Sequence, residues 1–312
     1  MRLVFLGTPS FAVPTLERIV EAGHEVLAVY TQPDRPKGRS QELTAPPVKQ
    51  TAVRLGLPVR QPERINRPEV VEELAGLKAD AMVVVGYGQI IPQSIIDLAP
   101  LGIINVHASL LPKYRGAAPV QWAIARGETT TGVTTMRIDA GLDTGDILLQ
   151  VETPIGPEET ATELSERLAW MGADLLIETL RGLEQGTIAS RKQDPALASH
   201  APMLKKEDGR IEWRLGAREI SNRVRGFQPW PGAWTHFRGQ LLHIWRAQMA
   251  GEAVVAAPGA VLPLKRRLLV ACGSGALEVL ELQLEGRKRM TAGDFLNGFR
   301  LAENEGLGEG KL

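Results

Sequence analysis

The sequence predicts an α/β protein, in which a doubly wound and mostly parallel sheet is followed by a small β-barrel. Two observations predict this fold class. Short apolar runs alternate with amphipathic helical patterns over the first half of the chain, and closely spaced β-prone runs fill the region from residue 233 onward. At 312 residues and 33.9 kDa the chain is long enough for two domains.

Apolar runs predict the strands of the first part. These runs are Leu3–Leu6, Val26–Thr31, Val59, Ala81–Val85, Ile103–Val106 and Val133–Ile138. Helical periodicity predicts helices at Val13–Ala22, Val48–Leu55, Pro68–Leu77, Gln93–Leu98 and, as a longer stretch, Thr160–Gln185. Active-site residues of such folds collect at the carboxyl ends of the strands.

Residues 190–208 mix prolines, small residues and single charges, which is typical of a linker. β-prone runs follow at Ala233–Phe237, Leu241–Arg246, Gly259–Leu262, Leu268–Ala271 and Leu277–Leu284. We therefore expect an α/β domain at 1–189, a linker at 190–208 and a β-barrel domain at 209–312.

The formal net charge of zero hides an asymmetry along the chain. Residues 209–300 contain 14 Lys and Arg against 7 Asp and Glu, a net charge of +7, so the remainder carries −7. Clustered Lys and Arg favour a polyanion partner through counterion release, although a solvated arginine-rich surface gives the same count.

The lone cysteine, Cys272, excludes an internal disulfide and has the neighbourhood of a packed core thiol. We expect a cytoplasmic protein, since neither a signal peptide nor a membrane-spanning run is visible.

One segment, Asn105–Pro119, and the turn Gly141–Asp146 that follows it carry the chemical signal. Residues two apart on a strand point to the same face, so Asn105 and His107 are expected to be neighbours. A second β-like run leads to the turn and should bring Asp143 to the same strand end. Each residue alone has a structural explanation, as a hydrogen-bonded core histidine or a turn former. The ordered set is what favours a site.

Other motifs exclude competing chemistries. The Gly7-Thr8-Pro9-Ser10 turn follows a strand but lacks the glycine spacing of a dinucleotide-binding loop. The sequence shows no phosphate-binding loop motif of NTPases and no histidines at metal-ligand spacing. We therefore expect chemistry without a metal, from ordinary side chains and an organic donor.

At these residues the sequence resembles the formyltransferases that use 10-formyltetrahydrofolate. The matching segments are Gly7–Pro9, Thr31–Arg39, Val84–Gly88, Asn105–Pro119, Asp139–Asp146 and Phe227–Gly232. The resemblance implies a Rossmann-like formyltransferase domain with a C-terminal OB-like β-barrel. It also implies 10-formyltetrahydrofolate as co-substrate and the α-amino group of methionine on initiator tRNA as acceptor. We expect no membrane partner and a monomer.

Formyl transfer to an amine passes through a tetrahedral oxyanion, and the three residues suit its needs. Asn105 can donate a hydrogen bond to the oxyanion, an interaction whose loss costs on the order of 3 kcal/mol. His107 can hold the formyl oxygen or protonate the leaving nitrogen, and Asp143 can stabilise a charged imidazole and accept the amine proton, directly or through water. The resemblance implies the same roles.

Two further groups of residues complete the predicted site. The resemblance implies a folate-binding group of Ser109, Leu110, Leu111, Pro112, Val85, Gly86 and Tyr87, although Leu110 and Leu111 alone would suggest core packing. The tRNA-binding group is Arg39, Arg35 and Lys37, together with Lys205, Lys206 and Arg266, which we expect to contact phosphates on the linker and barrel. The first three lie in Gln32–Pro47, a long connection that resembles the family's insertion into the acceptor stem and that could also be a solvated mobile loop.

Two rival functions remain open. The chain could formylate a small amine, such as glycinamide ribonucleotide or an amino sugar nucleotide, but the basic C-terminal part and basic loop favour tRNA. It could also be an RNA-binding module on an inactive α/β domain, but the presence of Asn105, His107 and Asp143 argues against that.

Overall fold

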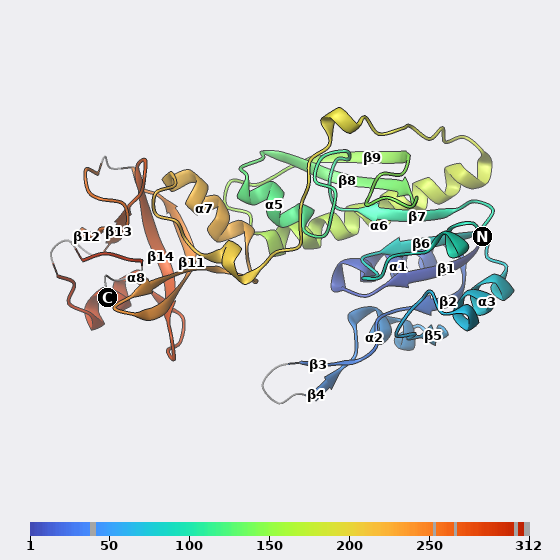
Figure 1. Cartoon of the computed structure of the whole chain (residues 1–312), viewed down its shortest axis with the longest axis horizontal. Helices are drawn as coiled ribbons and strands as arrows, with labels where there is room; N and C mark the ends of the chain where they lie inside the picture. Colours follow the sequence, from blue (N-terminus) through green and yellow to red (C-terminus); the bar gives the residue numbers. More distant parts are fainter. Residues whose placement is uncertain (38–41, 252–253, 265–266, 303–304, 309–312) are drawn as a thin grey trace. The chain divides into compact units, whose positions relative to one another are not determined.

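The computed structural model describes residues 1–37, 42–251, 254–264, 267–302 and 305–308. It divides into two compact units (Figure 1). Unit 1 comprises Met1–Gly116, Thr130–Pro154 and Ser165–Ala201. Unit 2 comprises Ala117–Thr129, Ile155–Leu164 and Pro202–Leu312.

Unit 1 contains a seven-stranded sheet of order β5-β2-β1-β6-β7-β8-β9. Its strands are β1 (Arg2–Gly7), β2 (Glu25–Tyr30), β5 (Val59–Arg60), β6 (Ala81–Val85), β7 (Ile103–His107), β8 (Thr130–Arg137) and β9 (Ile147–Pro154). The first five in the sheet order pair in parallel, whereas β8 and β9 are antiparallel. The predicted mostly parallel sheet is confirmed, and β9 is an addition that the apolar runs did not predict.

Helices cover both faces of this sheet. They are α1 (Val13–Glu21), α2 (Pro47–Arg54), α3 (Pro68–Leu77), α4 (Gln93–Ile96) and α6 (Ala161–Gln185). On one face, Ile103 of β7 shares a core with Leu74 of α3 and Ile95 of α4. On the other face, α6 packs so closely that a Cβ on Gly172 would lie 2.7 Å from Val106 Cγ1. Because Ile103 and Val106 point to opposite faces of β7, the sheet is doubly wound as expected.

The connection Gln32–Pro47 contains a short hairpin. Strand β3 (Arg35–Lys37) pairs antiparallel with β4 (Glu42–Thr44), and residues 38–41 between them lie outside the described residues. The hairpin is too short to give a periodic pattern, so the sequence predicted only a loop.

The first part of the expected linker, residues 190–201, belongs to unit 1 and is hydrogen-bonded within it. Arg191 and Ile147 exchange two backbone hydrogen bonds of 2.8 Å, and Arg115 N donates to Ser199 O at 2.8 Å. The Ala201 N–H then donates to Arg115 O at 2.7 Å. A 3-10 turn, η2 (Pro195–Leu197), lies between these contacts. Single-residue bridges of this kind leave no trace in the hydrophobic pattern.

Unit 2 is built on an antiparallel, curled sheet. Its order is β10-β11-β14-β13-β12, with β15 beside β14. The strands are β10 (Ala233–Phe237), β11 (Gln240–Met249), β12 (Val261–Leu264), β13 (Arg267–Ala271), β14 (Ala276–Leu284) and β15 (Met290–Thr291). Side chains alternate along β10: Ala233, Thr235 and Phe237 are buried, while Trp234 and His236 are partly exposed.

Three helices complete unit 2: α5 (Pro119–Ala125), α7 (Ala217–Gly226) and α8 (Ala292–Gly298). Ile220 of α7 and Phe295 of α8 belong to one core with Leu242 and Leu277 of the sheet. Cys272 lies in the same core, where burial raises the pKa of its thiol to about 11, so the expected packed thiol is confirmed. Among the described residues of the whole chain, none of the helices is long and apolar enough to span a membrane.

Candidate active site

Asn105 and His107 lie at the carboxyl end of β7. This strand runs between parallel β6 and antiparallel β8, with Asn105 opposite Val84 and His107 opposite Thr134. Both side chains are buried and point to the same face of the sheet, because they are two residues apart on one strand. The strand geometry expected from the sequence is thus present.

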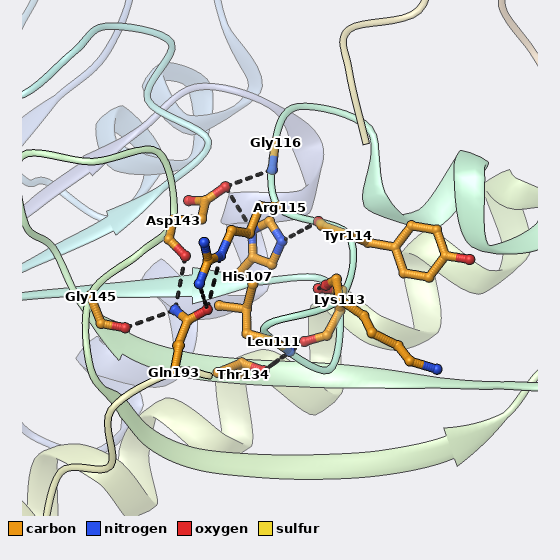
Figure 2. Close-up of polar contacts among 11 residues, drawn as sticks. His107, Leu111, Lys113, Tyr114, Arg115, Gly116, Thr134, Asp143, Gly145 and Gln193 are labelled. Atoms are coloured by element: carbon orange, nitrogen blue, oxygen red, sulfur yellow. Dashed lines mark hydrogen bonds and ion pairs between the residues drawn. The ribbon is translucent and has the colours of Figure 1, made fainter. Parts of the chain in front are cut away.

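The His107 ring is fixed by a backbone carbonyl. Its Nε2 lies 2.9 Å from Tyr114 O (Figure 2). A carbonyl oxygen only accepts hydrogen bonds, so Nε2 carries a proton and the neutral ring has its lone pair on Nδ1. That Nδ1 atom lies 3.7 Å from Asp143 Oδ2. Nδ1 is therefore the ring atom that can gain or lose a proton next to a carboxylate.

Asp143 comes from the turn that follows β8. Its backbone has a positive φ of 52°, and its side chain is 17% exposed. The Gly116 N–H donates to Asp143 Oδ2 at 2.8 Å, so the same oxygen faces both Gly116 and the His107 ring. The structure brings the Asp143 carboxylate to the strand end where the sequence placed it.

The Asn105 side chain has unused hydrogen-bonding capacity. Within the described part of the chain, its amide makes no hydrogen bond, although the residue is only 9% exposed. A buried amide without a partner costs free energy, about 1–3 kcal/mol, unless a ligand or water takes its place. The amide is thus available to a substrate oxygen beside His107.

The loop after β7 is held in place by hydrogen bonds to the Thr134 hydroxyl. This hydroxyl donates to Ser109 O at 2.6 Å and accepts from Leu111 N at 3.1 Å. The Gln150 side chain donates to Leu111 O and to the same hydroxyl, both at 2.9 Å. Ser109 and Leu111 are buried, whereas Leu110 and Pro112 are partly exposed. Leu110 and Pro112 are therefore the members of this loop that can contact a ligand through their side chains.

The second predicted folate segment follows β6. Val85 and Tyr87 are buried, and the Tyr87 ring belongs to the unit 1 core, where burial raises its pKa to about 12. Gly86 is exposed and has a φ of 57°, which favours glycine. The Tyr87 carbonyl accepts from Thr8 Oγ1 at 2.9 Å and from Gln32 Nε2 at 3.2 Å. Gly86 is the accessible member of this segment.

The residues predicted to bind tRNA are scattered. Arg35 is exposed on β3, and Lys37 ends the same strand. Lys205 and Lys206 are exposed at the 3-10 turn η3 (Lys206–Gly209) of unit 2. Arg39 and Arg266 lie outside the described residues. Over the described ranges, no group of three or more His, Cys, Asp or Glu could hold a metal ion.

Three polar residues around the site were missed by the sequence patterns: Thr134, Gln150 and Gln193. Thr134 and Gln150 support the loop 109–112. Gln193 lies beside the Asp143 turn together with Arg115, a member of the predicted segment Asn105–Pro119 (Figure 2). Thr134 could have been found, because it points to the same face of the sheet as His107. Gln193 gave no signal, since it lies in an aperiodic segment far from the motif.

Comparison with known proteins shows the family. The formyl transferase model matches residues 1–180, and the model of the formyl transferase C-terminal domain matches residues 203–300. A methionyl-tRNA formyltransferase of Solibacter usitatus is 69% identical over 312 residues, covering 100% of both chains. A methionyl-tRNA formyltransferase of Acidobacterium capsulatum is 58% identical over 99% of this chain and 100% of its own.

A solved structure shows the same fold at lower identity. It is an N-formyltransferase from Helicobacter canadensis in complex with folinic acid and dTDP-3-aminofucose. Its TM-score is 0.66 at 20% identity, and the match covers 89% of this chain and 98% of that one. With both family models matched and full-length relatives at such identity, the chain belongs to the formyl transferase family, among its methionyl-tRNA formyltransferases.

Proposed function

We propose that this enzyme transfers the formyl group of 10-formyltetrahydrofolate to the α-amino group of methionine on initiator tRNA. One observation carries the chemistry: the Asn105 amide, which hydrogen-bonds to no other residue that the structure describes, lies on the same strand face as His107, whose Nδ1 faces Asp143 Oδ2 at 3.7 Å. The relatives named methionyl-tRNA formyltransferase support the acceptor, because they align over essentially the whole chain.

The reaction requires one new bond and one broken bond. The amine nitrogen attacks the formyl carbon, giving a tetrahedral intermediate whose oxygen carries the negative charge. The Asn105 amide and a protonated His107 Nδ1 donate hydrogen bonds to that oxygen. The bond from carbon to the folate nitrogen then breaks, and the electron pair stays on that nitrogen.

Asp143 and His107 together accept and supply the protons that move in the reaction. The attacking amine loses one proton, which Asp143 accepts directly or through water. The leaving folate nitrogen gains one proton, which His107 Nδ1 supplies. Because Nε2 is held by Tyr114 O, the ring cannot exchange its two nitrogens during this transfer. The proton on Asp143 can then restore His107, so the side chains end as they began.

We place the formyl donor against the partly exposed side chains of Leu110 and Pro112 and the exposed backbone of Gly86. Apolar side chains next to exposed backbone groups suit a flat pterin ring with amide-like edges. Gly86 also lies where β6 meets β1, the point at which the strand order of the sheet reverses and ligands of such folds bind. The buried members of the predicted folate-binding group would then support this surface from within the core; they are Ser109, Leu111, Val85 and Tyr87.

We assign the tRNA to the C-terminal part of the chain together with the hairpin β3–β4. The net charge of +7 over residues 209–300 supports this, as does a cleft of about 650 Å³ in unit 2 that is lined by Arg126, Arg218 and Arg223.

We interpret the curled sheet as an OB-like barrel, with the catalytic domain at 1–189, the linker at 190–208 and the barrel domain at 209–312. We further expect a cytoplasmic monomer.

A formylation assay with competing acceptors tests the proposal. The purified enzyme is supplied with 10-formyltetrahydrofolate and with initiator methionyl-tRNA, elongator methionyl-tRNA, glycinamide ribonucleotide or a dTDP-amino sugar. We expect the initiator to be the preferred acceptor by at least about 100-fold in kcat/KM, a discrimination of about 2.7 kcal/mol. Preference for a small amine would overturn the assignment of tRNA.

A further inference from the structure

We propose that Gln193, held by Arg115, is a positioning residue for Asp143 in formyl transfer. The inference rests on the proposed function and adds a residue to its machinery. Gln193 belongs to the segment 190–201, which follows α6 and which the sequence pattern describes only as part of a linker.

The Gln193 side chain uses its whole hydrogen-bonding capacity inside the site. Its Nε2 donates to Asp143 O and to Gly145 O, both at 2.8 Å (Figure 2). Its Oε1 accepts from Arg115 Nε at 3.0 Å and from Arg115 Nη2 at 2.8 Å. A primary amide has two N–H donors and two acceptor lone pairs, and all four are engaged here. Among natural side chains of this length, only glutamine can make this set of contacts.

The turn that carries Asp143 needs such a support. Asp143 has a φ of 52°, a left-handed conformation that costs a non-glycine residue about 1–2 kcal/mol. Asp139 closes the first half of the turn, accepting from Gly141 N at 3.1 Å and from Thr144 Oγ1 at 2.7 Å. Gln193 closes the second half by joining the carbonyls on either side of Thr144. These contacts fix the backbone from which the Asp143 carboxylate extends.

The same network reaches His107 through three consecutive residues. Tyr114 O accepts from the His107 ring, Gly116 N donates to Asp143 Oδ2, and the Arg115 side chain between them binds Gln193. Gln193 therefore connects the Asp143 backbone to residues 114–116. This segment orients both the His107 ring and the Asp143 carboxylate, whose Nδ1 and Oδ2 atoms lie 3.7 Å apart. A shift of the turn by about 1 Å would change that separation and can cost about 100-fold in rate.

Gln193 is itself held in place before a substrate arrives. Two residues earlier, Arg191 exchanges two backbone hydrogen bonds of 2.8 Å with Ile147 at the start of β9. On the other side, the backbone of Arg115 is bonded to Ser199 and Ala201, and its side chain is almost fully buried at 8% exposure. The amide is thus preorganised by contacts on both sides, as a positioning residue must be.

Kinetics in two backgrounds test the proposal. Gln193→Leu should lower kcat about 10- to 100-fold with both KM values within about twofold, as loss of a supporting contact does at other sites. In an Asp143→Asn background the same change should lower kcat less than about twofold, because the group that Gln193 positions has already lost its function. Equal losses in both backgrounds would overturn the inference.

Two further variants sharpen the assay. Gln193→Glu keeps acceptors for Arg115 but sets anionic oxygens against two carbonyls, so we expect kcat to be at least as low as in Gln193→Leu. Activity of Gln193→Glu close to the unmodified enzyme would show that the two N–H donors are not needed. Gln283→Leu is the matched control: this glutamine also binds two groups, Trp245 Nε1 and Arg287 O, but in unit 2, and its loss should leave kcat unchanged.

An NMR measurement separates this inference from the proposed function. The Gly116 amide proton reports the bond to Asp143 Oδ2 without any substrate. Its signal should shift in Gln193→Leu and in Asp143→Asn, and should stay in place in Gln283→Leu. If the shift occurs but no methionyl-tRNA is formylated, the proposed acceptor is wrong and the positioning network stands. If the unmodified enzyme formylates methionyl-tRNA and the signal does not shift in Gln193→Leu, the Gln193 inference is wrong.

Discussion

The Nε2 atom of His107 lies 2.9 Å from the backbone oxygen of Tyr114, and this contact decides which ring nitrogen takes part in chemistry. A carbonyl can only accept, so the bond fixes the proton on Nε2 and leaves Nδ1 to face Asp143. A histidine on an apolar strand would have been equally compatible with a structural role. The orientation of its second nitrogen toward a carboxylate is what supports a catalytic one.

Two amide substitutions at His107 should separate the functions of the two ring nitrogens. His107→Gln can keep a donor near Nε2 and so preserve the contact with Tyr114, whereas His107→Asn can keep only a group near Nδ1. We expect both variants to lose at least about 100-fold in kcat/KM, because neither amide can transfer a proton. Thermal melting should show His107→Gln to be the more stable of the two. Near-normal turnover in either folded variant would contradict proton transfer by His107.

The hydroxyl of Thr134 should control binding of the formyl donor. Thr134→Val removes the partner of Leu111 N and Ser109 O in a fully buried position, which should cost about 1–3 kcal/mol of unfolding free energy. We also expect KM for the formyl donor to rise, because the loop with Leu110 and Pro112 loses its support. Urea unfolding and steady-state kinetics measure the two effects.

The neighbouring Thr135 is a matched control for that experiment. Its hydroxyl points to the opposite face of β8, where it contacts Thr179 Oγ1 at 2.8 Å and accepts from Leu149 N at 3.1 Å. Thr135→Val should therefore reduce stability by a similar amount and leave KM for the donor unchanged. A rise of KM in both variants would mean that loss of stability, rather than the loop, weakens donor binding.

Glu278 should make the stability of the protein depend on pH. The paired hydrogen bonds from Arg267, at 2.7 and 2.8 Å, hold the pKa of the Glu278 carboxyl below its ordinary value of 4.5, and Gln248 adds to the effect. A depressed pKa in the folded state stabilises the protein above the unfolded value, and this contribution is lost as the pH falls through the folded pKa. Glu278→Gln should therefore lose about 2 kcal/mol at pH 7 and much less in acid.

Urea titrations at pH 7 and below pH 4 check the Glu278 prediction. Glu281→Gln serves as the comparison, because Glu281 pairs with Arg246 and Arg289 at a more exposed position and should contribute less than about 1 kcal/mol. A destabilisation by Glu278→Gln that is equal at both pH values would exclude the ionic contribution.

Lys205 and Lys206 should add to tRNA affinity through counterion release. Both are exposed near the start of Pro202–Leu312, the longest segment of unit 2. If each contacts a phosphate, the double change to alanine should reduce the slope of log affinity against log salt by up to about 2. The measurement is tRNA binding over a salt series, with binding of the formyl donor over the same series as control. An unchanged slope would remove both lysines from the tRNA-binding group.

Arg39 and Arg266 should differ in how they affect acceptor choice. Arg39→Ala should lower the ratio of kcat/KM for initiator over elongator methionyl-tRNA, since a planar guanidinium can contact base edges. Arg266→Ala should weaken both acceptors about equally, as expected for a phosphate contact. The reverse result, with the ratio reduced only in Arg266→Ala, would exchange the two assignments.

The sequence by itself determined most of the strands, the main helices of unit 1 and the placement of Asn105 and His107 on one strand face, because these depend on local periodicity along one segment. It also pointed to Asp143, since the turn follows directly from the end of β8. Helices α5, α7 and α8 and strands β3, β4, β9 and β15 were missed. Most of these elements span eight residues or fewer, and such short elements give weak patterns.

Only the tertiary structure decided which nitrogen of His107 faces Asp143 and that Gln193 supports the Asp143 turn. Both depend on contacts between residues far apart in the chain, 50 residues in the case of Gln193 and Asp143. Such contacts form where the backbone is already fixed by sheet pairing, and they satisfy polar groups that folding removes from water. A hydrophobic pattern predicts which side chains become buried on folding. It does not predict which buried polar atoms form hydrogen bonds with one another.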